Sequence, residues 1–312
     1  MDPFVPVKES IPCAEAVGVS ACGVAHMCGQ RGSMEDAFCA FAVPHTPFFF
    51  LAVLDGHGGR GTADFAASRL LPSIMATREW VEAAASGFSN DGVVLSALRA
   101  GFTACDAAAY AALRATSEER SGSTAIAALV SPSRIFVANC GDSRALLVRE
   151  VGASTIALSM DHKPDAPSER ARLAGNAGAA SCKGGYFAGL AVSRSLGDFR
   201  TKLDHQRAAA SAPPPLLPVE QQTVTSEPEV VVVVRGASDA FLVLACDGVW
   251  DVVENSGAAA FVRDAHSGGA APEDVAAALI HDCLERGSND NMTAIVCKLF
   301  SEPPGAGGGL GQ

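Results

Sequence analysis

Short apolar runs that end in turn-forming residues recur along the chain and predict buried β-strands. The run from Phe48 to Leu54 is aromatic and apolar, and it stops at Asp55-Gly56-His57-Gly58-Gly59. The run from Phe241 to Cys246 stops in the same way, at Asp247-Gly248. Each predicted strand therefore carries a carboxylate at its end. The two carboxylates together suggest one shared site for a hard cation.

Other strand-like runs surround these two and are predicted at 19–26, 34–43, 123–130, 135–139, 144–149, 229–234 and 292–299. The three runs between residues 123 and 149 are separated only by Ser-Pro-Ser and Gly-Asp-Ser turns. Connections this short cannot contain a crossover helix, so we expect an antiparallel meander there. The order of strand and turn from residue 19 to residue 54 also favours antiparallel pairing.

Helical spacing of apolar residues, or an alanine-rich composition, marks a second set of segments. Helices are predicted at 60–80 (interrupted or kinked at Pro72), 91–116, 167–176, 257–264 and 271–285. The helices form blocks separate from the strands. The pattern therefore predicts an α+β fold, in which two antiparallel sheets pack face to face and helices cover the outside.

The composition limits the class of protein. The 312 residues include 48% hydrophobic residues, which suffices for one large domain with a sizeable core. The formal net charge of −11 argues against a nucleic-acid partner, which requires a basic face. No apolar stretch has the length that we expect of a membrane span. The N-terminus shows no secretory signal, so reduced cysteines and a cytoplasmic or nuclear location are expected.

The ten cysteines are scattered singly, without a Cys-x-x-Cys pair, which argues against a zinc ribbon or a thioredoxin-type site. We expect an N-terminal arm at 1–18, one domain at 19–300 and a disordered tail at 301–312. Within the domain, the proline- and alanine-rich stretch around 201–226 is interpreted as a surface insertion.

Four acidic positions lie beside a predicted strand and a turn: Glu35-Asp36, Asp55, Asp247 and Asp290. Ligands that offer only oxygen suit magnesium or manganese rather than zinc. Several carboxylates in one cleft need cations to stay ionised, and two divalent ions about 3.5–4 Å apart would satisfy them. Such a pair activates a bridging water for in-line attack on a phosphoryl group.

Two further residues fit this chemistry. Arg31 lies four residues before Glu35, and its fork of N–H donors can hold a phosphate group through two bonds. His57 follows Asp55-Gly56 and can protonate a departing serine or threonine alkoxide. Taken singly, Asp55 and Asp247 have a simpler interpretation, because Asp-Gly after a strand is most often only a turn.

Eight segments occur in order and resemble the motif series of the metal-dependent protein serine/threonine phosphatases of type 2C (PPM-type). They are RGSMEDAF, VLDGHGG, SGSTA, ANCGDSRALL, DHKPD, LAVSRSLGD, ACDGVWDVV and GSNDNMTAIV, and they span about residues 19 to 299. The resemblance implies a four-layer α-β-β-α sandwich. It also implies hydrolysis of phosphoserine and phosphothreonine by a water that bridges two divalent metal ions.

The resemblance also implies a ligand set for two Mg²⁺ or Mn²⁺ ions. Glu35, Asp55 and the backbone carbonyl of Gly56 would bind one ion. Asp55, Asp247 and Asp290 would bind the other, so that Asp55 bridges the two.

The remaining roles follow from the same resemblance. Arg31 would bind the substrate phosphate, His57 would be the general acid, and Asp36 would stand behind the metal ligands. Asp142 would support a weaker third metal ion together with Asp247, and an ordinary hairpin turn is the alternative for Asp142. Phosphorylated proteins would be the substrates, and a monomer without a nucleic-acid or membrane partner is expected.

Some positions depart from the family pattern or match it without a clear role. Phe38 stands where relatives often carry histidine, and we expect a changed cleft wall there. The segment 179–189 is short, glycine-rich and without tryptophan. Asp198 and Asp251 match acidic positions of the family. In the DHKPD segment we expect Asp161 and Lys163 to pair locally.

Two other functions stay open at this point. The first is a catalytically inactive relative that acts as a regulatory module. Such a protein would lack a metal ligand or the phosphate-binding arginine, and this sequence has all of them. A two-metal phosphatase acting on small phosphate esters would differ only in the shape of its cleft.

Overall fold

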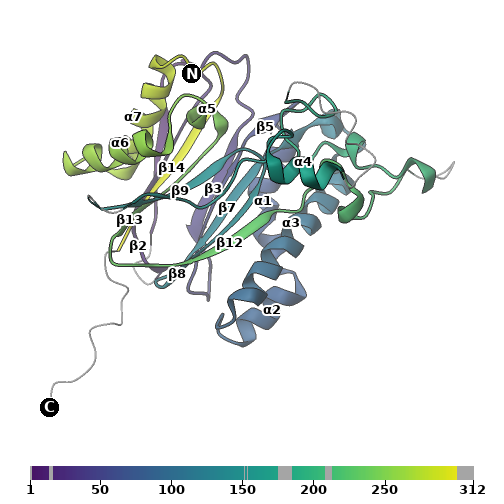
Figure 1. Ribbon diagram of the computed structural model, residues 1–312, viewed down its shortest axis with the longest axis horizontal. Helices are drawn as coiled ribbons and strands as arrows, with labels where there is room; N and C mark the ends of the chain where they lie inside the picture. The colour runs from purple at the N-terminus through teal and green to yellow at the C-terminus, as the bar shows by residue number, and fades with distance from the viewer. Residues whose placement is uncertain are drawn as a thin grey trace.

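Two antiparallel sheets lie face to face between two layers of helices in the computed structural model (Figure 1). The structure describes residues 2–13, 17–150, 152, 154–174, 185–207 and 213–300. The fold class expected from the sequence is confirmed. The expected tail at 301–312 lies outside the described residues.

The first sheet has six strands in the order β1-β2-β14-β13-β9-β10. Their bounds are β1 Val7–Ile11, β2 Val19–Met27, β14 Met292–Leu299, β13 Asp239–Ala245, β9 Arg144–Arg149 and β10 Ile156–Ala157. The strand β1 extends the edge of this sheet by pairing with β2, from Val7↔His26 to Ile11↔Cys22.

The second sheet has five strands in the order β12-β8-β7-β4-β3. Their bounds are β12 Glu229–Val234, β8 Arg134–Cys140, β7 Ala125–Val130, β4 Phe49–Leu54 and β3 Ala37–Ala42. A small sheet joins β11 Leu196–Gly197, β6 Gly122–Ser123 and β5 Gly56–His57.

The helices form the two outer layers, which Figure 1 shows on opposite sides of the sheets. One layer contains α1 Gly61–Met75, α2 Arg78–Ala85 and α3 Asp91–Leu113. The other contains α5 Asp247–Trp250, α6 Asn255–Ser267 and α7 Pro272–Glu285. The helix α4 Pro167–Ala174 and the short 3₁₀ helices at 117–120, 199–201, 205–207 and 219–221 belong to the connections.

Three apolar clusters hold the four layers together. In β4, Phe49, Leu51 and Val53 pack in the cluster between the two sheets. Phe50 and Leu54 point the other way, into the cluster beneath α1 and α3. A third cluster lies between the first sheet and α6 and α7. A strand that is buried on both faces has no polar face, which is why 48–54 is apolar throughout its length.

The expected meander is correct for β7 and β8 but wrong for β9. The strands β7 and β8 pair with each other, whereas β9 belongs to the other sheet, where it pairs with β13 and β10. The chain crosses between the sheets at Gly141, which adopts φ +120°. Only glycine adopts this conformation readily, because it has no Cβ atom. Likewise, β2 pairs with β14 and not with the strand that follows it.

The predicted helix at 60–80 is divided into two helices. The helix α1 continues three residues beyond Pro72 and ends at Met75. Thr77 then begins α2, because its hydroxyl accepts a hydrogen bond from the backbone N–H of Trp80. The helices α3 and α7 lie close to their predicted ranges, α6 is longer than predicted, and α5 was not predicted.

Two observations depart from the expectations drawn from composition. Cys22 and Cys297 face each other in β2 and β14 and are joined as a disulfide, so these two thiols are not free. The helix α3 is long and apolar enough to cross a membrane by length and composition alone. Its buried face, which includes Val94, Leu98 and Phe102, packs in the protein core, as expected of a core helix.

Candidate active site

The ends of several strands and their connections meet at one edge of the sandwich and form a cleft of about 340 Å³. Asp55 and Asp247 follow the ends of β4 and β13, and Asp142 lies in the crossing from β8 to β9. Asp290 precedes β14, and Arg31 lies between β2 and β3. All five side chains line this cleft, together with Gly56 and His57.

Three carboxylates form the acidic centre of the cleft. Ligand oxygens of Asp55, Asp142 and Asp247 lie within 4.8 Å of one another. A second group at the same spacing contains Asp36, Asp55 and Cys246, so Asp55 belongs to both. Burial raises the pKa of the Cys246 thiol well above its usual range. A thiol that stays protonated is a poor ligand, which leaves the carboxylate oxygens as the donors.

The pKa values of Asp36, Asp55 and Asp247 are raised, because burial and mutual repulsion disfavour their charged forms. Burial, followed by repulsion from Asp36 and Asp247, raises the pKa of Asp55 well above its ordinary value. Burial and the charge of Asp142 raise the pKa of Asp247 to about 7, and burial raises that of Asp36 to about 6. A divalent cation would remove this repulsion. The donor set therefore fits hard cations such as Mg²⁺ or Mn²⁺.

Asp36 lies behind the cleft rather than in it. Its side chain is buried, and its Oδ2 accepts a hydrogen bond of 2.6 Å from the Thr293 hydroxyl. Its Oδ1 has no hydrogen-bond partner among the described residues. This carboxylate therefore supports the back of the site next to Asp55.

Glu35 and Asp290 lie outside both three-residue acidic groups. Glu35 Oε2 accepts a hydrogen bond from the Gly59 N–H at 3.2 Å, and Oε1 accepts one from the Ser33 hydroxyl at 3.1 Å. Asp290 Oδ2 accepts a 2.6 Å bond from Arg31 Nη2. The side chain of Arg31 is 59% exposed at the mouth of the cleft, where an incoming phosphate can reach it.

His57 is held by a carboxylate that the sequence did not connect with it. Its Nε2 lies 2.8 Å from Asp198 Oδ2, and the same oxygen accepts a 2.6 Å bond from the Ser195 hydroxyl. Burial lowers the pKa of His57, but the hydrogen bond and charge of Asp198 outweigh burial and raise it. Gly122 lies against this pair, and any side chain there would clash with both residues.

The backbone of Asp198 is fixed from behind by a buried ion pair. Lys202 Nζ lies 2.9 Å from Asp106 Oδ2 in α3 and donates to the Ser195 carbonyl at 2.8 Å. Asp106 Oδ1 accepts a 2.7 Å bond from the Gly197 N–H. Both charged side chains are almost completely buried. They tie the loop that carries Asp198 to the helical layer.

Lys163 is a site residue that the sequence did not indicate, and the expected pairing of Asp161 with Lys163 is wrong. Asp161 instead binds Arg144 through two hydrogen bonds, and Lys163 donates to Asp142. Lys163 Nζ also lies 3.8 Å from Asp247. Burial lowers the pKa of Lys163, but the charge and hydrogen bond of Asp142 outweigh burial, so the pKa is raised overall. The ammonium group therefore stays charged beside the acidic centre.

Other positions named from the sequence lie around the site. The ring of Phe38 packs against that of His26 in a tilted arrangement, with 5.5 Å between ring centroids, and Phe38 does not line the cleft. Of the segment 179–189, only residues 185–189 are described, and Tyr186 and Gly189 line the cleft. Burial raises the pKa of Asp251. The charge of Lys163 opposes this shift, and the charge of Asp142 adds to it.

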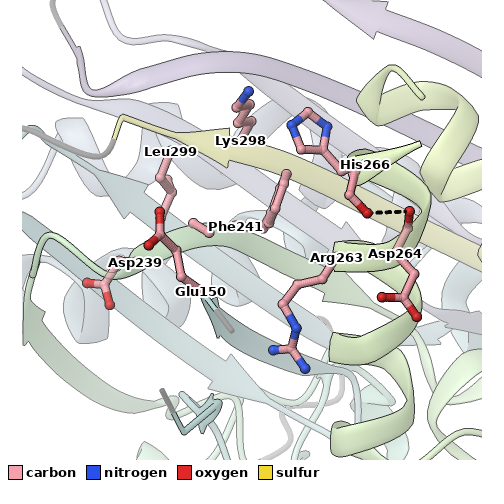
Figure 2. Close-up of a pocket in the computed structure, with 10 residues that line it drawn as sticks. Glu150, Asp239, Phe241, Arg263, Asp264, His266, Lys298 and Leu299 are labelled. Atoms are coloured by element: carbon pink, nitrogen blue, oxygen red, sulfur yellow. Dashed lines mark hydrogen bonds between the residues drawn. The ribbon is translucent and has the colours of Figure 1, made fainter. Parts of the chain in front are cut away.

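Another cavity, of about 550 Å³, is not at this edge of the sandwich. Figure 2 shows it lined by Phe241, near the start of β13, and by Leu299, at the end of β14. Acidic and basic side chains are mixed there, among them Glu150, Arg263 and Lys298. It lies at the far ends of the strands whose other ends carry Asp247 and Asp290, and it contains none of the acidic residues predicted from the sequence.

Comparison with known proteins places the chain in one family. A family model described as protein phosphatase 2C matches residues 20–292. Protein phosphatase 1B of Rattus norvegicus is 37% identical over 290 residues, which cover 90% of this chain and 70% of the rat protein. The probable protein phosphatase 1N of Mus musculus is 40% identical over 277 residues, which cover 88% of this chain and 63% of the mouse protein.

A solved structure shares the fold. The serine-threonine phosphatase 2C from Toxoplasma gondii matches with a TM-score of 0.74 over 94% of this chain and 99% of that chain. At 20% sequence identity, this likeness concerns the fold. It agrees with the arrangement of two sheets between two helical layers.

Proposed function

The chain belongs to the protein phosphatase 2C family of metal-dependent serine/threonine phosphatases, and we propose that it hydrolyses phosphoserine and phosphothreonine in proteins with two Mg²⁺ or Mn²⁺ ions. The observation that carries this proposal is the convergence of Asp55, Asp142 and Asp247 in the cleft that also contains Arg31 and His57. These residues come from separate segments of the chain, and only the fold brings them together.

We assign the metal ligands as follows. Asp55 belongs to both acidic groups and would bridge two cations, with Asp247 and Asp290 on one side and Glu35 and the Gly56 carbonyl on the other. Bound divalent ions would lower the pKa of a water molecule and polarise the phosphoryl group. Asp142 would contribute to a weaker third site in competition with the Lys163 ammonium group.

The other residues bind and orient the substrate. Arg31 offers its guanidinium at the mouth of the cleft, where it can hold two phosphate oxygens. His57 Nε2 is held by Asp198, whose charge favours the protonated ring. A protonated imidazole can give its proton to the alkoxide that departs from phosphoserine or phosphothreonine.

We further propose that the protein acts as a monomer on phosphorylated proteins in the cytoplasm or nucleus, without a nucleic-acid or membrane partner. The net charge of −11 supports the exclusion of nucleic acid, because a polyanion would be repelled. The phosphatase relatives support phosphorylated proteins as the substrate class.

The function is tested by hydrolysis of a phosphothreonine peptide with and without manganese, in the wild type and in Asp247→Asn. We expect Asp247→Asn to lose more than about a hundredfold in activity, because a metal ligand is removed. Its unfolding midpoint in the absence of metal should stay equal or rise, because repulsion from Asp142 is relieved.

Asp264→Asn, which changes a carboxylate in α6 away from the cleft, is the matched control and should keep full activity. Excess chelator should abolish activity, and added manganese should restore it. Full activity in excess chelator, or in Asp247→Asn, would falsify the metal mechanism.

A further inference from the structure

The segment before β1 is fixed next to the loop that carries Arg31. The Pro3 carbonyl accepts a 2.8 Å hydrogen bond from the Gly29 N–H. Within the segment, Asp2 accepts a 3.0 Å bond from the Phe4 N–H through its side chain and a 3.2 Å bond from the Val5 N–H through its carbonyl. The strand β1 then pairs with β2 along its whole length. Residues 2–5 therefore form a hydrogen-bonded turn that stands at a defined place.

This turn closes one side of a groove of about 400 Å³, which we call the N-terminal groove. Its lining comes from both sides and is mainly apolar, with Pro3, Val5, Val7, Met27 and Met34, while Asp2, His26 and Arg31 add polar groups. The apolar rim is open to solvent, since Val5 is 57% exposed and the neighbouring Phe4 is 48% exposed. Exposed apolar surface beside a concave space is typical of a binding site for an apolar group.

The N-terminal groove adjoins the catalytic cleft. Arg31 lines both cavities, with its guanidinium at Asp290 on the cleft side. A phosphate held by Arg31 therefore lies within about one side-chain length of the groove. An extended peptide advances about 3.3–3.6 Å per residue, so residues close in sequence to the phosphorylated residue can reach it.

We propose that the N-terminal groove binds an apolar side chain of the protein substrate, one to three residues from the phosphorylated serine or threonine. This inference rests on the proposed phosphatase function and names the class of substrate that it favours. Of the charged residues in its lining, Asp2 would repel an acidic side chain, and Arg31 is already paired with Asp290 and would hold the phosphate. An acidic residue at that position would therefore lose hydration without a free partner. The groove thus selects for leucine, methionine or phenylalanine.

The test compares pairs of phosphothreonine peptides that differ only in having Leu or Asp at one position, scanned over three residues on each side. The measured quantity is the ratio of kcat/KM for the two peptides of a pair. We expect the wild type to prefer Leu at one position by about tenfold, the scale of one apolar contact. Val5→Asp should abolish the preference, mainly through KM, and Val5→Ala should reduce it.

Val81→Asp is the matched control, because Val81 is 62% exposed on α2 in the opposite helical layer. It should keep the wild-type ratio. Activity without a Leu preference at any position, or a preference that survives in Val5→Asp, would overturn the groove and leave the phosphatase function intact. Inactivity of the wild type on every peptide and on p-nitrophenyl phosphate with manganese would overturn both.

Discussion

Replacing Lys202 with Met removes the cation from the buried pair that holds the His57–Asp198 contact in place. Lys202 and Asp106 are 0% and 1% exposed, and their atoms Nζ and Oδ2 are 2.9 Å apart. The substitution leaves the Asp106 carboxylate buried without its counter-ion. It also removes the bond from Lys202 to the Ser195 carbonyl. The loop that carries Asp198 thus loses the tie from Lys202 to Asp106 in α3 and its internal bond to the Ser195 carbonyl.

Breaking a buried ion pair by removing one partner typically lowers the free energy of unfolding by about 3–5 kcal/mol. We expect a loss of that size for Lys202→Met, measured by urea denaturation followed by fluorescence. The double variant Asp106→Asn/Lys202→Met should recover most of it, because no charge is left buried. The amide oxygen that this variant carries at position 106 can still accept the Gly197 N–H, as Asp106 Oδ1 does at 2.7 Å.

The same variants test the link to catalysis. A displaced Asp198 holds His57 less well, so a substrate that needs its leaving group protonated should be affected most. Lys202→Met should therefore slow hydrolysis of phosphothreonine more than that of p-nitrophenyl phosphate, and Lys202→Arg should restore part of the difference. The reasoning is refuted if Lys202→Met unfolds like the wild type, or if both substrates slow equally.

Two further predictions concern pH. Asp198→Asn should lower the pKa of His57, because the carboxylate that raises it is gone. The decline of kcat/KM for phosphothreonine at high pH should then begin at lower pH, and an unmoved profile would count against the pairing. Glu169 is fully buried, and hydrogen bonds from Arg194 and Arg172 overcome burial and lower its pKa to about 2. Glu169→Gln should lower stability by about 1.5–3 kcal/mol at pH 7. This difference should shrink as pH falls below about 4.5 toward 2, because the carboxylate stabilises the fold only while it is ionised. A difference that stays constant down to pH 2 would refute the ionic contribution.

Local pattern was enough to predict the strands that carry the site. The apolar run of β4 and its stop at Asp55 depend on burial on both faces and on turn chemistry, which neighbouring residues determine. The strands β12 and β14 have the bounds that the sequence predicted, 229–234 and 292–299. The ordered motifs also identified the family before any contact was known.

The sequence by itself determined most of the strands and helices and the acidic residues that follow the two central strands, because burial leaves a pattern of apolar residues along the chain. The tertiary structure alone decided how these pieces meet. It sent β9 to the other sheet, placed Lys163 against Asp142 and brought Asp198 to His57, 141 residues away along the chain. Such contacts depend on cooperative packing of distant surfaces, and the spacing of residues along a chain carries no record of which surfaces will touch.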